Sequence, residues 1–292
     1  MLRQKYSKSI ILILFSILLI GLTGCSPSGK LLEQTDTGTY LRYDMPDKPL
    51  DYRFTSNMKQ NVKAKGREFD ILSDNLCRYS ISCDDKTDND FRMTVTIDTM
   101  FVNFQSPMGP VVPDMSSING KSFVMMLTPD GHEYDLDEAE KLRYDIIPGR
   151  SISLLPTFQN VFPDLTDQSL KPGGSWTDYD TLTENSEAGY IQIIFESINT
   201  FIGYEVVDNY RCAKISASVT GEITGKSSEQ GVDLVSSGKL TGTDIWYFAP
   251  KEGRLIRMES KGIGMTITTG TADEKIEIPS MREYSMTLEL VK

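Results

Sequence analysis

The chain has 292 residues, 39% of them hydrophobic and 24% charged, and its formal net charge is −11. Nucleic acid and anionic lipid headgroups are poor partners for so acidic a surface, so we expect no nucleic-acid partner. The length is enough for one large domain or two smaller ones, and we interpret the acidity as a source of solubility rather than as a cation site.

The first 24 residues predict a signal peptide. Arg3, Lys5 and Lys8 form a positive head, and residues 10–20 are apolar apart from one serine. This run is shorter than the ~20 residues that a transmembrane helix needs. Residues 22–25, LTGC, resemble the lipobox of bacterial lipoproteins, in which a peptidase cleaves before the cysteine and the thiol is lipidated.

The lipobox resemblance implies that Cys25 begins the mature chain and that acyl chains anchor it to a bilayer. Serine at the next position favours the outer membrane in a cell with two membranes; with one membrane, it means the outer face of the plasma membrane. Removing residues 1–24 takes away three positive charges and no negative one, so 27 Lys+Arg remain against 41 Asp+Glu, a net charge of −14. Residues 25–48 are polar and without periodicity, so they predict a lipidated tether before an exported domain at 49–292.

Alternating polar and apolar residues dominate after Lys48 and predict a mainly β (α+β) fold with a large antiparallel, curved sheet. The segment 91–101 places on one face Phe91, Met93, Val95, Ile97 and Phe101. The segment 282–291 does the same with Tyr284, Met286, Leu288 and Leu290. Further strands are predicted at 51–60, 67–72, 76–83, 121–128, 176–182, 189–198, 202–207, 211–220, 240–249, 254–260 and 263–269.

The middle of the chain, residues 134–165, predicts two short helices, at 134–145 and 151–162. In the second, the apolar residues recur at helical spacing and would share one face: Leu154, Leu155, Phe158, Val161 and Phe162. Such an apolar stripe normally packs on a sheet, and this is the interpretation that we favour. The alternative is a face for an apolar ligand around Phe158 and Phe162.

Two segments echo each other across the chain. Residues 120–136 and 242–258 both have the pattern of a strand, a turn with proline and glycine, and a second strand. Gly131 and Gly253 would supply the positive φ that such turns require. A duplicated β half, with halves at 49–147 and 172–292, explains the echo, and two ordinary hairpins explain it equally well.

Three cysteines remain after Cys25. Cys77 and Cys83 are six residues apart in a predicted strand, a separation of ~20 Å that is too long for a disulfide. A disulfide from Cys212 to one of them is one expectation, and buried free thiols are the other.

Residues 161–176 and 242–255 resemble an uncharacterised family of exported β-rich bacterial proteins, often lipoproteins. The first match is carried by Phe162, Pro163, Leu165, Gly174, Ser175 and Trp176, and the second by Gly242, Thr243, Trp246, Tyr247, Phe248, Gly253 and Leu255. The family has a proline after the leucine where this chain has Thr166. The resemblance covers about residues 155–260 and implies export and a β fold, not an activity. More loosely, the architecture is similar to that of curved-sheet carriers of lipids and lipoproteins.

Signals of catalysis are missing from the sequence. His132 is the single histidine, and zinc-binding and phosphate-binding motifs are absent, so we expect no enzyme and no cofactor. A loop at 84–90 could hold calcium through Asp84, Asp85, Asp88 and Asp90, although a solvated hairpin loop is the preferred interpretation.

Three functions follow as expectations. The first is a membrane-anchored envelope lipoprotein, not an enzyme, that binds a lipid or another apolar ligand in a cavity of at least a few hundred Å³. The second is a structural or protein-interaction module of the cell envelope. The third, a carboxylate-based hydrolase, requires two carboxylates within ~10 Å and a perturbed pKa.

Overall fold

The computed structural model describes residues 38–291 apart from gaps at 65, 88, 148–149, 187–188, 230–231 and 272–274. The predicted signal peptide and Cys25 lie outside the described residues. None of the helices in the described part of the chain combines the length and the apolar character needed to span a bilayer.

The fold is mainly β, as predicted, with one large antiparallel sheet and two short helices in the middle of the chain. The first half contributes to the sheet β1 (Leu50–Ala64), β2 (Arg67–Lys86), β3 (Phe91–Ser106), β4 (Gly109–Val111), β5 (Ser122–Leu127) and β6 (Glu133–Tyr134). The second half contributes β9 (Ser175–Ser186), β10 (Gly189–Val207), β11 (Tyr210–Glu229), β12 (Val232–Ala249), β13 (Arg254–Thr271) and β14 (Lys275–Val291).

The first and last strands, β1 and β14, lie side by side in the centre of this sheet. The strand order is β6-β5-β3-β2-β1-β14-β13-β12-β11-β10-β9, with β4 beside β3. The first half therefore runs outward to one edge, and the second half starts at the opposite edge and returns to the centre. There β1 and β14 pair from Asp51 opposite Val291 to Val62 opposite Ser280.

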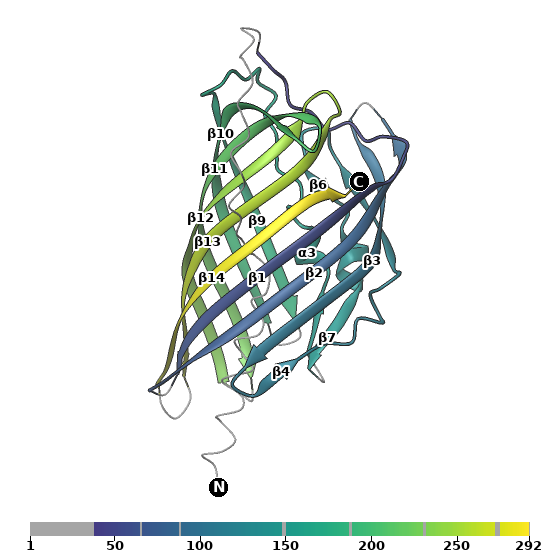
Figure 1. The fold of residues 1–292 in the computed structure, drawn as a ribbon. Coiled ribbons are helices and arrows are strands. Elements are labelled where there is room, and N and C mark those ends of the chain that lie inside the picture. The colour runs from purple at the N-terminus through teal and green to yellow at the C-terminus, as the bar shows by residue number, and fades with distance from the viewer. Residues whose placement is uncertain are drawn as a thin grey trace.

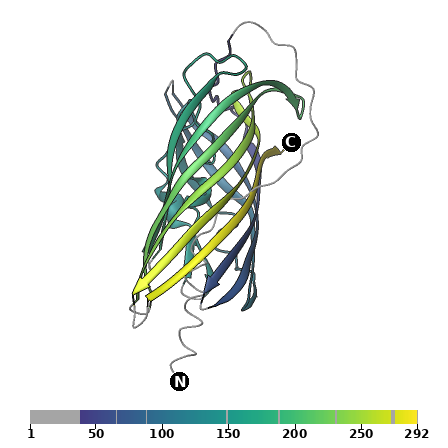
Figure 2. The same ribbon diagram turned by 90° about the vertical axis from the view of Figure 1, so that its left-hand side faces the viewer.

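The segment that crosses from one edge to the other fills the concave side of the sheet. Figures 1 and 2 show that the strands curve strongly and that α3 lies inside the curve. The crossing segment consists of α2 (Asp137–Lys141), a hairpin of β7 (Arg143–Ile147) and β8 (Arg150–Ser153), and α3 (Leu155–Phe158). The sheet needs such a cover because its concave face is apolar.

The two predicted helices are real but much shorter than predicted. The β7–β8 hairpin occupies the space between them, and α3 ends because Gln159 is extended and Asn160 has a φ of 65°. Pro156 lies in the first turn of α3, where proline is tolerated. The apolar stripe packs in the core, as the favoured interpretation had it: Leu154, Phe158, Val161 and Phe162 are all buried.

One predicted strand face is wrong at its end. Phe91, Met93, Val95 and Ile97 are buried as predicted, but Phe101 is 47% exposed. Thr99 pairs with Arg78 and Ile97 pairs with Tyr79, so Asp98 is an extra residue in β3. This β-bulge exchanges the two faces, and Met100, Val102 and Phe104 become the buried set.

Residues 38–48, the described end of the predicted tether, pack as part of the folded domain. Leu41, Tyr43 and Met45 are buried. The backbone N–H of Tyr43 donates to Pro129, and that of Asp44 donates to Gly253. These acceptors lie in the β5–β6 and β12–β13 turns, the two hairpins that echo each other in the sequence. Gly131 and Gly253 have φ values of 109° and 62°, which confirms the predicted positive φ.

The three cysteines of the described chain are free thiols. The disulfide expectation is therefore wrong, and the alternative of buried free thiols is confirmed for Cys77 and Cys212, which lie in different apolar clusters, while Cys83 is free but only partly buried. Trp246 and Tyr247 also lie in different clusters, because adjacent strand residues point to opposite faces, and both are buried.

Candidate functional site

A cavity of about 160 Å³ lies between the concave face of the sheet and a segment made of α3 and the residues that follow it. The apolar part of its wall includes Phe195, Leu240, Trp246, Met258 and Leu288. The polar part includes Asp164, Asp178, Asp180 and Asp244. Ligand pockets usually measure ~300–1,000 Å³, so this one is smaller than the cavity expected for a lipid. It is close to the ~150 Å³ of an apolar cavity that can take up benzene.

Three of these carboxylates converge from two elements. Asp178 and Asp180 are two residues apart on β9 and therefore share its cavity-facing side. Asp164 comes from the loop after α3, where Trp176 Nε1 donates to its backbone carbonyl at 3.3 Å. Each of the three has a carboxylate oxygen within 4.8 Å of the others. Among the described acidic, histidine and cysteine side chains, this is the group close enough to share a metal ion.

Burial and mutual repulsion make protons bind tightly here. Burial, together with the charges of Asp178, Asp180 and Asp130, raises the pKa of Asp164 to about 7. The Asp164 carboxyl donates a hydrogen bond to Asp178, which opposes the rise that burial causes in the pKa of Asp178. Burial also raises the pKa of Asp180. Near neutral pH the Asp164 carboxyl is therefore protonated in part of the molecules.

Asp244 lies farther along the cavity wall, on β12. Burial raises its pKa to about 6, and a hydrogen bond with Ser260 opposes the rise. Its side chain is surrounded by protein but keeps some accessible surface, which we attribute to its position on the cavity wall. The cavity therefore has acidic groups at two places along an otherwise mainly apolar wall.

Glu133 and His132 lie near this acidic end without forming part of the cavity lining. One Glu133 carboxylate oxygen accepts from the backbone N–H of Phe162 at 2.7 Å, and burial raises the pKa of Glu133 well above its usual range. His132 is exposed and stacks on Tyr134, with ring centroids 6.5 Å apart. Its charge would lower the pKa of Asp178 and Asp180.

The predicted ligand face divides between core and cavity. Phe158 is fully buried and makes edge-to-face contacts with Tyr79 and Phe123, so it serves the core. Phe162 is also buried, against Tyr43 and Tyr52, but it forms part of the cavity lining.

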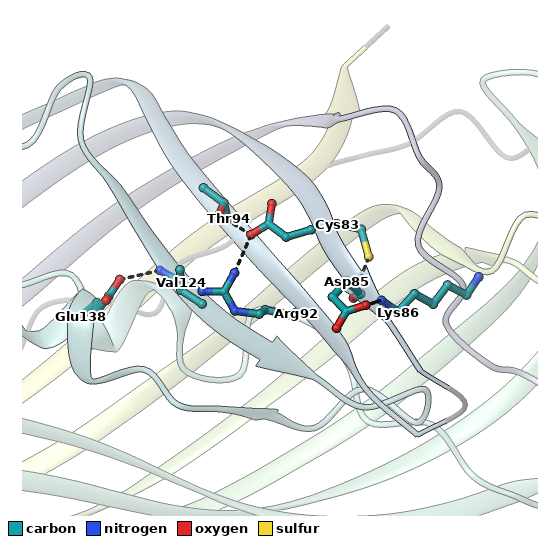
Figure 3. Close-up of polar contacts among 8 residues, drawn as sticks. Cys83, Asp85, Lys86, Arg92, Thr94, Val124 and Glu138 are labelled. Atoms are coloured by element: carbon teal, nitrogen blue, oxygen red, sulfur yellow. Dashed lines mark hydrogen bonds and ion pairs between the residues drawn. The ribbon is translucent and has the colours of Figure 1, made fainter.

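The aspartates of the 84–90 loop do not converge where the structure describes them, which excludes Asp88. Asp84 accepts from Thr94 at 2.6 Å and pairs with Arg92 at 3.1 Å, while Asp85 accepts from the backbone N–H of Lys86 (Figure 3). Asp90 accepts from the hydroxyl of Tyr134 on another strand. These partners make the described part of the loop an ordinary polar hairpin connection.

Sequence reasoning missed the carboxylates that the fold brings together. The D-x-D spacing of Asp178 and Asp180 was visible, but in a chain with 41 acidic residues it is not distinctive. Asp164 lies inside the motif FPDL, which draws attention to its turn and core residues instead.

No family model and no curated protein matches the chain. Among solved structures, a protein described as exported, with a YmcC-like fold, from Bacteroides fragilis is 11% identical, with a TM-score of 0.25 over 87% of this chain and 100% of that one. An outer membrane channel from Pseudomonas putida is 9% identical, with a TM-score of 0.26 over the same shares. A BenF-like porin from Pseudomonas fluorescens is 5% identical, with a TM-score of 0.19 over 85% of this chain and 100% of that one. At these TM-scores the similarities assign neither a fold family nor a role.

Proposed function

We propose that this protein is a membrane-anchored envelope lipoprotein, not an enzyme, that binds a small apolar ligand on the concave side of its sheet. The observation that carries the binding role is the cavity of about 160 Å³ with its mainly apolar wall. The envelope location and the anchor are supported by the charged head, the short apolar run and the LTGC segment that ends at Cys25.

The volume limits the ligand to one small apolar group. A cavity near 150 Å³ accommodates a benzene-sized molecule, so a single ring or the end of one acyl chain fits, and a whole diacyl lipid does not. The alternative, a structural or protein-interaction module, does not require a cavity.

The test compares the protein with a cavity-filling variant. Val219 forms part of the cavity lining on β11, and Val219→Phe would place a ring in the free space. Val235→Phe makes the same change at a side chain that is 48% exposed. After solvent extraction, mass spectrometry should find a co-purified ligand with the natural protein and with Val235→Phe, and less with Val219→Phe. If the natural protein carries no ligand and binds no added one, the interaction module becomes the better proposal.

The anchor has a separate test. Mass spectrometry of the native N-terminal peptide should find Cys25 at the terminus with acyl chains attached. An unmodified Cys25 still joined to Gly24 would contradict the anchoring.

A carboxylate-based hydrolase is the second candidate, favoured by Asp164 and Asp178. Their oxygens lie within 4.8 Å, and the pKa of Asp164 is raised to about 7, which suits a general acid. Turnover of chromogenic aryl glycosides that disappears in Asp164→Asn would establish this candidate in place of the binding role.

A further inference from the structure

We propose that the cavity selects a ligand with a primary ammonium group on a small apolar body, and that Asp164, Asp178 and Asp180 hold the ammonium. This inference rests on the proposed function, since it names the class of ligand that the same cavity takes.

The two ends of the cavity differ in chemistry. The side formed by β12 and β14 presents Leu240, Trp246 and Leu288 with the carboxyl of Asp244 among them, and the side formed by β9 and the loop after α3 presents three carboxylates. A wall of this kind suits a ligand that is apolar along its body and polar at one end. Asp180 accepts from the backbone N–H of Thr181 and Asp178 from the Asp164 carboxyl, but a fully apolar ligand would leave these buried charges without a cation beside them, which is unfavourable.

The charge at the acidic end is not neutralised within the described residues. None of the ion pairs found there involves Asp164, Asp178 or Asp180. His132 acts on Asp178 and Asp180 only through space. A bound cation would relieve the repulsion that burial and the neighbouring charges impose on these groups.

A second, independent feature of the same wall also lacks a partner. Thr157, on α3, is 8% exposed, and its hydroxyl makes no hydrogen bond in the described structure. Buried hydroxyls normally have a partner, and Thr157 forms part of the cavity lining. The hydroxyl oxygen itself has almost no accessible surface, so a ligand with a polar end would supply the missing hydrogen bond once the side chain turns toward the cavity.

An ammonium fits this set of groups better than a calcium ion. Three N–H donors match three carboxylates, and the apolar body occupies the remaining wall. Calcium takes six to eight oxygen ligands, and on binding here it would leave the apolar part of the cavity wall unoccupied.

Three probes of nearly equal size test the selection: benzylammonium, benzyl alcohol and benzoate. Binding is measured by saturation-transfer NMR and calorimetry with the full chain in lipid nanodiscs, with empty nanodiscs as the blank. Benzylammonium should bind at least about tenfold more tightly than benzyl alcohol, and benzoate should not bind measurably. Asp178→Asn and Asp180→Asn should each reduce this preference, while Asp167→Asn, at an exposed position in the same loop as Asp164, should leave it unchanged.

The outcomes separate this inference from the proposed function. Equal binding of benzylammonium and benzyl alcohol would overturn the selection and support the apolar site. No binding of any probe would overturn both. Calcium chloride that binds alone and displaces benzylammonium would overturn the ammonium assignment in favour of a metal site. If an aspartate variant melts at a lower temperature, Val219→Phe provides the second variant: it should abolish benzylammonium binding, and retained binding would place the probe elsewhere.

Discussion

At the scale of single residues, the backbone at Gly131 shows how a turn is adapted to its neighbours. Gly131 has a φ of 109°, and a Cβ there would lie 2.6 Å from the carbonyl oxygen of Pro163 and 2.9 Å from the ring of Tyr43. Gly109 has the same φ of 109°, but a Cβ there would have no atom within 4 Å. The two positions therefore separate the cost of the conformation from the cost of the clash.

We expect Gly109→Ala to lower the free energy of unfolding by about 1–2 kcal/mol, the cost of the positive φ alone. Gly131→Ala should cost clearly more, because the backbone of the 163–164 loop must also move. Urea denaturation of both variants measures the difference. Equal losses would mean that the loop moves freely away from the turn.

The acidic end of the cavity predicts a pH dependence of stability. The pKa of Asp164 rises from its usual 3.8 to about 7 on folding, so the folded state binds this proton more tightly than the unfolded state. The resulting stabilisation is fully present below pH ~4 and is lost as the pH rises through ~7.

Asp164→Asn removes this dependence, because asparagine resembles the protonated acid. At pH 8 the variant should be more stable than the natural protein by on the order of 2 kcal/mol. This is less than the free energy that corresponds to the whole pKa shift of Asp164, because Asp164 shares its proton with Asp178. At pH 4 the gain should vanish. Thermal unfolding across this pH range gives the comparison, with Asp167→Asn as the control; a constant difference at every pH would contradict the assignment.

At the scale of elements, the edge strand β9 is protected by one side chain. Gln159, just after α3, donates to the carbonyl of Thr181 at 3.0 Å and accepts from the N–H of Thr183 at 3.1 Å. The amide thus makes the hydrogen bonds that a neighbouring strand would make. Unpaired backbone groups on such an edge can pair with a strand of another chain. The same contacts hold the loop carrying Asp164 beside β9.

Gln159→Ala should lower the free energy of unfolding by about 1–3 kcal/mol, since two partly buried backbone groups lose their partners. Gln168→Ala, at an exposed side chain, should change it by less than ~0.5 kcal/mol. Denaturant unfolding tests the stability, and light scattering should show more self-association only for Gln159→Ala. A Gln159 variant as stable as the Gln168 variant would show that water replaces the amide without loss.

Element by element, the sequence allowed the strands to be predicted better than the helices. Alternation identified β3 and β14 because one face of each is buried, and it failed at Phe101 because an inserted residue, Asp98, leaves no mark in the pattern. The apolar stripe from Leu154 to Phe162 suggested a helix of three turns. In the structure one short helix and the loop after it place these side chains in the core. The carboxylate cluster could not be predicted, since it depends on where the crossing segment places Asp164 against β9.

At the scale of the whole molecule, the central pairing of β1 with β14 makes the two predicted halves interdependent. A single apolar cluster contains Tyr52 and Tyr79 from the first half, Phe158 from the crossing segment, and Trp246 and Leu288 from the second. The halves therefore share one core, even though each is a continuous series of neighbouring strands. A duplication, if it occurred, did not leave two separate folding units.

We therefore expect one cooperative unfolding transition for the whole chain and none for residues 172–292 alone. The fragment would expose the unpaired edge of β14 and lose the crossing segment that covers its apolar face. Unfolding of the whole chain is followed by far-ultraviolet circular dichroism, which reports on both halves, and by the fluorescence of Trp176 and Trp246, which lie in the second half. The two unfolding transitions should have the same midpoint. If the fragment unfolds cooperatively at the midpoint of the whole chain, the second half carries its own stability, and the shared core contributes little to it.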